Sequence, residues 1–196
     1  MVKLAITFIL GFLFISEHAH ASPEPIIDFS VEYYSVSGRT TDEINRSIFE
    51  NTPIMMSGRR YGAVTKNDFI TNFDQIASRR GGCEVRNVRV ELKSKVILPK
   101  LTPAYQSNQV SQEWNRYLSA LIDHEKLHAN NARRTAETLV TRLFGLESDL
   151  PCDQMKVKLN QAIDLLVSRM GAWDLRLDQQ TSHGAAQGAF LQGGLN

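Results

Sequence analysis

The sequence predicts an α+β fold in which an N-terminal antiparallel sheet packs against a long helix and a second helix near the C-terminus. Two periodicities predict this fold. Residues 83–99 alternate between apolar and polar side chains, as strands with one buried face do, and residues 109–144 repeat apolar side chains every three or four positions, as amphipathic helices do. A chain of 196 residues with 42% hydrophobic residues is long enough to form one domain around a sizeable core.

Residues 1–21 have the order of a secretory signal peptide. Lys3 precedes an apolar run over residues 4–15, and Ala-His-Ala at residues 19–21 forms a cleavage site of small residues. The alternative is a retained membrane anchor, but the apolar run is about a dozen residues, whereas a spanning helix needs ~20. We therefore expect residues 22–196 to form a single exported domain, periplasmic or secreted, without a transmembrane segment after cleavage.

Three strands are expected in the first half of the exported chain. Residues 27–36 and 63–77 alternate moderately, and a short helix that begins at Thr41 as N-cap lies between them. The third strand has the clearest alternation, with one apolar face formed by Val88, Val90, Leu92, Val96 and Leu98. A sheet with one buried face and one solvated face favours antiparallel pairing.

Two helices are expected in the second half. The first covers residues 109–144 and ends at Gly145, and the second covers residues 149–173. The Gly-rich residues 184–196 are expected to form a flexible tail.

The formal net charge of the whole chain is +1, so nothing in its composition indicates a nucleic-acid partner.

His124-Glu125-Lys126-Leu127-His128 lies within the long predicted helix. Residues four apart on a helix share a face, so the two histidines can bind one metal ion about 2 Å from each ring nitrogen. Glu125 lies one step round the helix, where it can take a proton from a water molecule. The spacing therefore predicts a hydrolytic zinc site, with a surface coincidence of two histidines as the alternative.

A third protein ligand is needed, because catalytic zinc sites combine three ligands with one open position. Of the five histidines, His18 and His20 leave with the signal peptide, so His183 is the remaining histidine of the exported chain. Glu137 and Glu147 are carboxylate alternatives. Asn131 and Arg134 occupy the positions where a metzincin has its Gly and third His, which excludes that arrangement.

The two cysteines, Cys83 and Cys152, are expected to form a disulfide, because an exported protein folds in an oxidising compartment. The alternative is two buried, unpaired thiols. A disulfide would tie the strand region to the last helix, and we expect it to lie near both halves of the proposed site.

Several sequence elements occur in the order found in a known family. They are Tyr34-Ser35-Val36-Ser37-Gly38, Cys83, Leu98-Pro99, Trp114, the His124–His128 segment, Cys152, and Asp178 through Thr181-Ser182-His183-Gly184. In these elements the chain resembles the bacterial family called domain of unknown function 922, whose members are described as secreted zinc-dependent proteases. The resemblance implies a zincin-like fold, one zinc ion per chain and His183 as the third ligand.

The expected reaction is metal-assisted hydrolysis of a peptide bond with Glu125 as general base. Asp123 and Asp178 are candidates to orient the zinc ligands, because such ligands usually need a hydrogen-bond partner. A zinc-dependent peptidoglycan amidase and a non-catalytic envelope protein with a structural zinc remain alternatives. The sequence predicts no particular substrate, oligomeric state or regulation.

Overall fold

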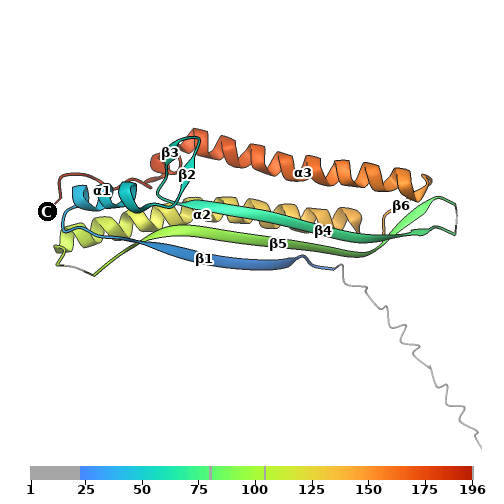
Figure 1. The fold of residues 1–196 in the computed structure, drawn as a ribbon, viewed down its shortest axis with the longest axis horizontal. Coiled ribbons are helices and arrows are strands. Elements are labelled where there is room, and N and C mark those ends of the chain that lie inside the picture. Colours follow the sequence, from blue (N-terminus) through green and yellow to red (C-terminus); the bar gives the residue numbers. More distant parts are fainter. Residues whose placement is uncertain (1–22, 80, 104, 196) are drawn as a thin grey trace, which may run out of the picture.

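A computed structural model of the chain describes residues 23–79, 81–103 and 105–195, so the predicted signal peptide lies outside the described residues. The fold is α+β, as predicted. A long, narrow sheet has one helix along its inner face, and a second long helix runs beside the first (Figure 1). These helices are α2 (Asn108–Leu143) and α3 (Cys152–Thr181).

The sheet has the strand order β1-β5-β4, with β5 in the middle. The bounds of these strands are Ile26–Val36 for β1, Val64–Ala77 for β4 and Cys83–Leu101 for β5. β4 and β5 are antiparallel, as predicted, but β1 runs parallel to β5, so the prediction of an antiparallel sheet is wrong for this pair. Alternation of apolar and polar residues reports which face is solvated, and it favours antiparallel pairing without fixing the direction of any one pair of strands.

Shorter elements connect and flank these strands. α1 (Thr41–Asn51) follows β1, and its N-cap is Thr40 instead of the predicted Thr41, because the Thr40 side chain accepts a hydrogen bond from the backbone N–H of Glu43. β2 (Met55–Met56) and β3 (Arg59–Arg60) form a small hairpin where only a turn was expected. β6 (Glu147–Ser148) pairs with the start of β5.

α2 covers the apolar face of the sheet. Its bounds agree with the predicted 109–144 to within one residue at each end, and its buried stripe includes Trp114, Tyr117, Leu121 and Leu139. The Ser107 side chain caps its N-terminus by accepting a hydrogen bond from the backbone N–H of Val110. With 36 residues, the helix is about 54 Å long, so it connects clusters of buried residues along the whole sheet.

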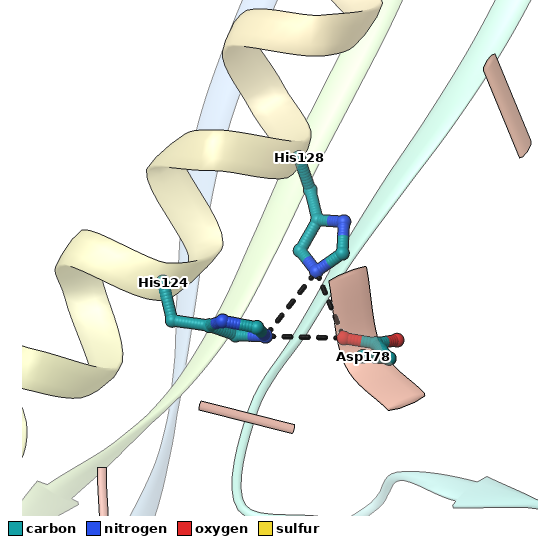
Figure 2. Close-up of side chains that lie close together, drawn as sticks. All are labelled: His124, His128 and Asp178. Carbon is teal, nitrogen blue, oxygen red and sulfur yellow. Dashed lines mark hydrogen bonds and ion pairs between the residues drawn. The ribbon is translucent and has the colours of Figure 1, made fainter. Parts of the chain in front are cut away.

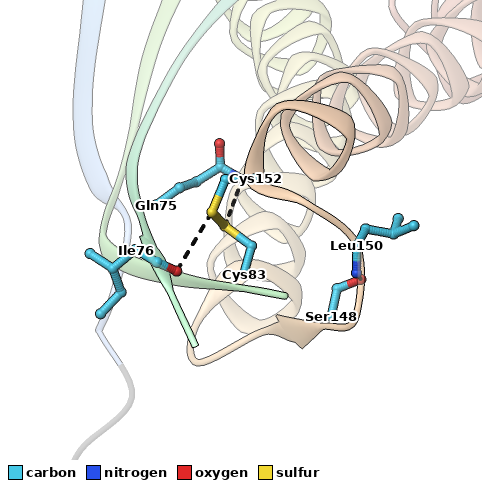
Figure 3. Close-up of a disulfide and its surroundings, with 6 residues drawn as sticks. All are labelled: Gln75, Ile76, Cys83, Ser148, Leu150 and Cys152. Atoms are coloured by element: carbon cyan, nitrogen blue, oxygen red, sulfur yellow. Dashed lines mark hydrogen bonds between the residues drawn. A yellow bond between two sulfur atoms is a disulfide. The ribbon is translucent and has the colours of Figure 1, made fainter. Parts of the chain in front are cut away.

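The predicted disulfide between Cys83 and Cys152 is present and joins the first residue of β5 to the first residue of α3 (Figure 3). Its expected position near the proposed site is wrong. Asp178, which belongs to the site described below, lies near the other end of α3, about 39 Å further along the helix axis. The disulfide therefore links β5 to α3 at the end of the molecule that is farthest from Asp178.

The C-terminal segment is packed against the fold, unlike the flexible tail that the sequence predicted. The short helix η1 (Ala185–Gln187) follows α3, and beyond it Leu191 is buried in the core formed by α1, α2 and the sheet. The backbone N–H of Thr41 donates to the carbonyl of Leu195 over 3.1 Å.

Among the helices of the described residues, none combines the length and the hydrophobicity that crossing a membrane requires.

Candidate metal centre

His124, Glu125 and His128 lie on the covered side of α2, with 2%, 5% and 6% of their surface exposed. The two histidines point toward α3, as their spacing on one helix face predicts (Figure 2). Glu125 turns toward the sheet instead, where it meets Thr65 of β4. The helix therefore places two imidazoles and one carboxylate in a region shielded from bulk water.

Asp178 of α3 completes a triangle of possible metal ligands (Figure 2). Its Oδ1 atom lies 3.1 Å from the Nε2 atoms of both His124 and His128, and those two nitrogens are 3.3 Å apart. Ligands that share one ion at about 2.0 Å in tetrahedral geometry are about 3.3 Å from one another. The triangle therefore has the size that one bound ion needs.

Both histidines are held in the orientation that a metal ligand requires. His124 Nδ1 lies 2.8 Å from Gln187 Oε1, and His128 Nδ1 lies 3.0 Å from Asp174 Oδ1. Each of these oxygens accepts a hydrogen bond, so each Nδ1 carries a hydrogen and each Nε2 faces the centre, where it can bind an ion once it is deprotonated. Asn131 Nδ2 donates to Asp174 Oδ1 over 3.0 Å and fixes that carboxylate in turn.

His183, the predicted third ligand, lies at the edge of this group. Its Nδ1 is 3.5 Å from Asp178 Oδ2, its side chain is 43% exposed, and its ring lies 4.4 Å from that of Tyr61. Within the described residues, the ligand atoms that lie within 4.8 Å of one another come from His124, His128 and Asp178. The role of His183 as a ligand stays a prediction, and Asp178 occupies the position between the two histidines.

The other carboxylates considered from the sequence lie elsewhere. Asp123 is 68% exposed and accepts from Lys126 over 3.0 Å. Glu137 pairs with Arg133 on the exposed side of α2, and Glu147 lies in β6, next to the disulfide end of the sheet. Asp123 therefore does not orient a histidine in this structure, and neither Glu137 nor Glu147 reaches the triangle.

Glu125 has the environment of a proton acceptor. Burial raises its pKa, and a hydrogen bond of 2.7 Å from the Thr65 hydroxyl to Oε2 opposes that rise. The carboxylate lines the same cavity as the three possible ligands. A raised pKa makes the group a stronger base than an exposed glutamate once it is ionised.

The charges around the triangle favour a bound cation. Burial alone would lower the pKa of His128, but its hydrogen bonds to Asp174 and Asp178 outweigh burial and raise the pKa to about 10. Burial likewise opposes ionisation of Asp178, but the hydrogen bonds from His124 and His128 hold its pKa well below the ordinary value. Without a metal ion, the site therefore holds a proton between its ligands.

The site opens into a cavity of about 240 Å³. Its walls include Met56 of the β2–β3 hairpin, Tyr61, Tyr117, Leu121 and Leu175. Aromatic and aliphatic side chains thus surround a small polar centre, which is the composition of sites that bind organic molecules. The cavity allows a substrate to approach the ligands and Glu125 together.

Three functional residues were not identified from the sequence: Thr65, Asp174 and Gln187. Asp174 and Asp178 carry a recognisable signal, because they are four residues apart on a predicted helix and so share a face, as the two histidines do. Thr65 and Gln187 carry no comparable signal, since single polar residues in a strand or a turn are common.

The fold and the site define an α+β protein with a buried His-His-Asp group that can hold a metal ion. The family model described as "Bacterial protein of unknown function (DUF922)" matches residues 31–184, and the chain belongs to this family. The matched region extends from β1 to Gly184, so it includes the whole triangle. Comparison with curated proteins and with solved structures gave no match.

Proposed function

We propose that the protein is an exported zinc-dependent peptidase that binds zinc through His124, His128 and Asp178. The convergence of three ligand atoms beside the buried carboxylate of Glu125 is the observation that supports this function best. A purely structural metal site has no need of a proton acceptor. The position of Glu125 therefore favours catalysis over a structural role.

The donor set fits zinc. Two neutral imidazoles and one carboxylate are a common set in catalytic zinc sites, and they leave a coordination position open. The same donors also bind iron(II), so the metal must be identified by elemental analysis. His183 is the reserve ligand, because its ring already lies beside the second oxygen of Asp178.

The mechanism follows from the positions of the side chains. His124, His128 and Asp178 would hold a zinc ion, which would supply a Lewis acid for a carbonyl group and for a water molecule. Glu125 accepts the proton of that water and later delivers it to the departing amine. The Thr65 hydroxyl donates to Oε2 and so holds the carboxylate in position. Gln187 and Asp174 hold the Nδ1 hydrogens of His124 and His128, so both rings would bind the ion through Nε2.

The proposed location is the periplasm or the extracellular medium. The bond between Cys83 and Cys152 is compatible with an oxidising compartment, and the signal-peptide pattern of residues 1–21 supports the same location. In that location, a peptidase meets exported proteins and the peptide stems of peptidoglycan. Both carry the amide bond that the proposed mechanism cleaves.

The test begins with metal analysis of the protein purified from the periplasm without added metal. The protein is then incubated with casein and with muropeptides, each with and without a chelator. We expect about one zinc ion per chain and chelator-sensitive cleavage of at least one substrate class. Cleavage of muropeptides alone would replace the peptidase with the amidase alternative, and zinc binding without hydrolysis of either substrate would support a structural metal.

A further inference from the structure

We infer that Gln187 is a positioning residue for His124, and that Glu113 and Arg116 hold Gln187 in place through the C-terminal segment. The inference rests on the proposed metal site and extends it to residues outside the predicted ligand set. It assigns a role in metal binding to residues 184–192, which the sequence predicted to be a flexible tail.

The contact between Gln187 and His124 determines which ring nitrogen faces the centre. Gln187 Oε1 lies 2.8 Å from His124 Nδ1 and accepts its hydrogen. The Nε2 atom then faces the centre, 3.1 Å from Asp178 Oδ1. Without an acceptor at Nδ1, the ring would be free to carry its hydrogen on Nε2, and that tautomer cannot bind a metal through Nε2.

The turn that carries Gln187 presses against the His124 ring. Ser182, His183 and Gly184 all have positive φ, at 50°, 54° and 82°. A Cβ atom at Gly184 would lie 2.9 Å from His124 Cγ, closer than side chains approach one another, so glycine allows this contact. The turn thus supplies both a wall behind the ring and the acceptor for its Nδ1 hydrogen.

The turn is anchored by a charged pair on α2. Arg116 donates to the carbonyl of Gly188 over 2.8 Å and also to the carbonyl of Phe190. Glu113 accepts two hydrogen bonds from Arg116, at 2.6 and 2.7 Å, and its Oε1 also accepts from the backbone N–H of Gln192 over 2.8 Å. Glu113 is 7% exposed and Arg116 is 39% exposed, so a buried carboxylate holds a guanidinium that lies at the surface.

Anchoring matters because Gln187 itself is exposed. An exposed glutamine has several rotamers and water competes for its amide, so its hydrogen bond to His124 depends on the position of the backbone. The bonds from Arg116 and Glu113 fix that backbone on the C-terminal side, and η1 is only three residues long. Metal binding and docking of the C-terminal segment should therefore favour each other.

The test compares Gln187 with a glutamine that lies outside the C-terminal segment. Gln187→Met keeps the length of the side chain and removes the acceptor, Gln187→Glu keeps an acceptor oxygen, and Gln161→Met is the matched control at an exposed position of α3. Zinc affinity is measured by competition with a chelating dye, and melting temperature is measured for each metal-free variant. We expect about tenfold weaker zinc binding for Gln187→Met, parent-like affinity for the other two variants, and similar melting temperatures for all.

A second pair tests the anchor. Arg116→Ala should also weaken zinc binding, whereas Arg133→Ala, which removes an exposed arginine of the same helix, should not. Parent-like zinc affinity in both Gln187→Met and Arg116→Ala would overturn the inference while leaving the metal site intact.

A metal-independent measurement separates this inference from the proposed function. In metal-free protein, the Nδ1 resonance of His124 should move in Gln187→Met, while that of His128 should stay in place. An unchanged His124 resonance would overturn the inference, whether or not the parent binds zinc. A parent protein that bound no zinc would instead refute the proposed zinc site.

Discussion

Thr65 of β4 donates a hydrogen bond of 2.7 Å to Oε2 of Glu125, and its hydroxyl also lies 3.2 Å from the backbone carbonyl of the same residue. One strand side chain thus contacts both the carboxylate and the backbone of α2. Thr65 is the register partner of Val96 on the central strand, so the sheet itself sets the position of the carboxylate.

Thr65→Val should move the acid limb of the pH–activity profile toward higher pH. Burial raises the pKa of Glu125 and the Thr65 hydroxyl opposes this rise, so loss of the hydroxyl raises the pKa further. Because hydrolysis needs the ionised carboxylate, the variant should require a higher pH than the parent for the same activity. Thr71→Val is the matched control, since the Thr71 hydroxyl is buried on the same strand without a hydrogen-bond partner among the described residues. A Thr65→Val profile that coincides with the parent's would contradict this role.

Glu125→Gln should separate metal binding from catalysis. The amide keeps the size of the side chain but cannot accept the proton of water, so we expect hydrolysis to fall by about 10²- to 10⁴-fold. Zinc content should stay near that of the parent, because Glu125 is not one of the three converging ligands. Endpoint assays with a substrate that the parent cleaves measure hydrolysis, and elemental analysis of the same sample measures the zinc content. Retained hydrolysis of every parent substrate would rule out Glu125 as the base.

Asp178→Ala and His183→Ala should differ in their effect on zinc affinity. Asp178 Oδ1 lies between the two imidazole nitrogens, so its loss removes a ligand, whereas His183 Nδ1 lies at the edge of the group, 3.5 Å from the second oxygen of Asp178. We expect isothermal titration to show a severe loss of affinity for Asp178→Ala and a milder one for His183→Ala. The reverse order would restore His183 as the third ligand and make Asp178 its orienting partner.

Sequence periodicity was sufficient to predict the two long helices and the three long strands, because the sheet has one buried face and α2 has one buried stripe. It did not predict the two-residue strands β2, β3 and β6. It did not predict that β1 runs parallel to β5, since the pairing direction depends on how the chain crosses between strands. The helical spacing of His124 and His128 predicted their convergence. The third vertex of the triangle depends on how α3 lies against α2, which periodicity does not report. Asp178 was therefore proposed only as an orienting group.

The metal-free protein should lose stability as the pH rises above neutral. The pKa of His128 is about 10 in the fold, compared with ~6.5 for an unfolded histidine. The stabilising contribution of its proton is therefore complete below ~6.5 and disappears as the pH rises toward 10. Melting temperatures in EDTA should fall over this range, and they should fall less for His128→Gln. Equal pH dependence in the two proteins would show that the His128 proton contributes nothing to stability.

Removal of the disulfide should reduce stability without affecting the metal site. The bond closes a loop with a sequence separation of 69, which corresponds to about 4 kcal/mol in the chain-entropy model. Urea unfolding of the Cys83→Ala/Cys152→Ala variant should show a lower free energy of unfolding, with zinc affinity unchanged because the disulfide lies far from Asp178 along α3. If both cysteines of the folded, periplasmic parent react with an alkylating agent before reduction, the disulfide is absent in solution.

Anomalous diffraction at the zinc absorption edge, from crystals of the protein loaded with one equivalent of zinc, would locate the metal ion. We expect a single strong peak about 2 Å from each of His124 Nε2, His128 Nε2 and Asp178 Oδ1. A peak at other residues, or none between these three atoms, would contradict the proposed zinc site.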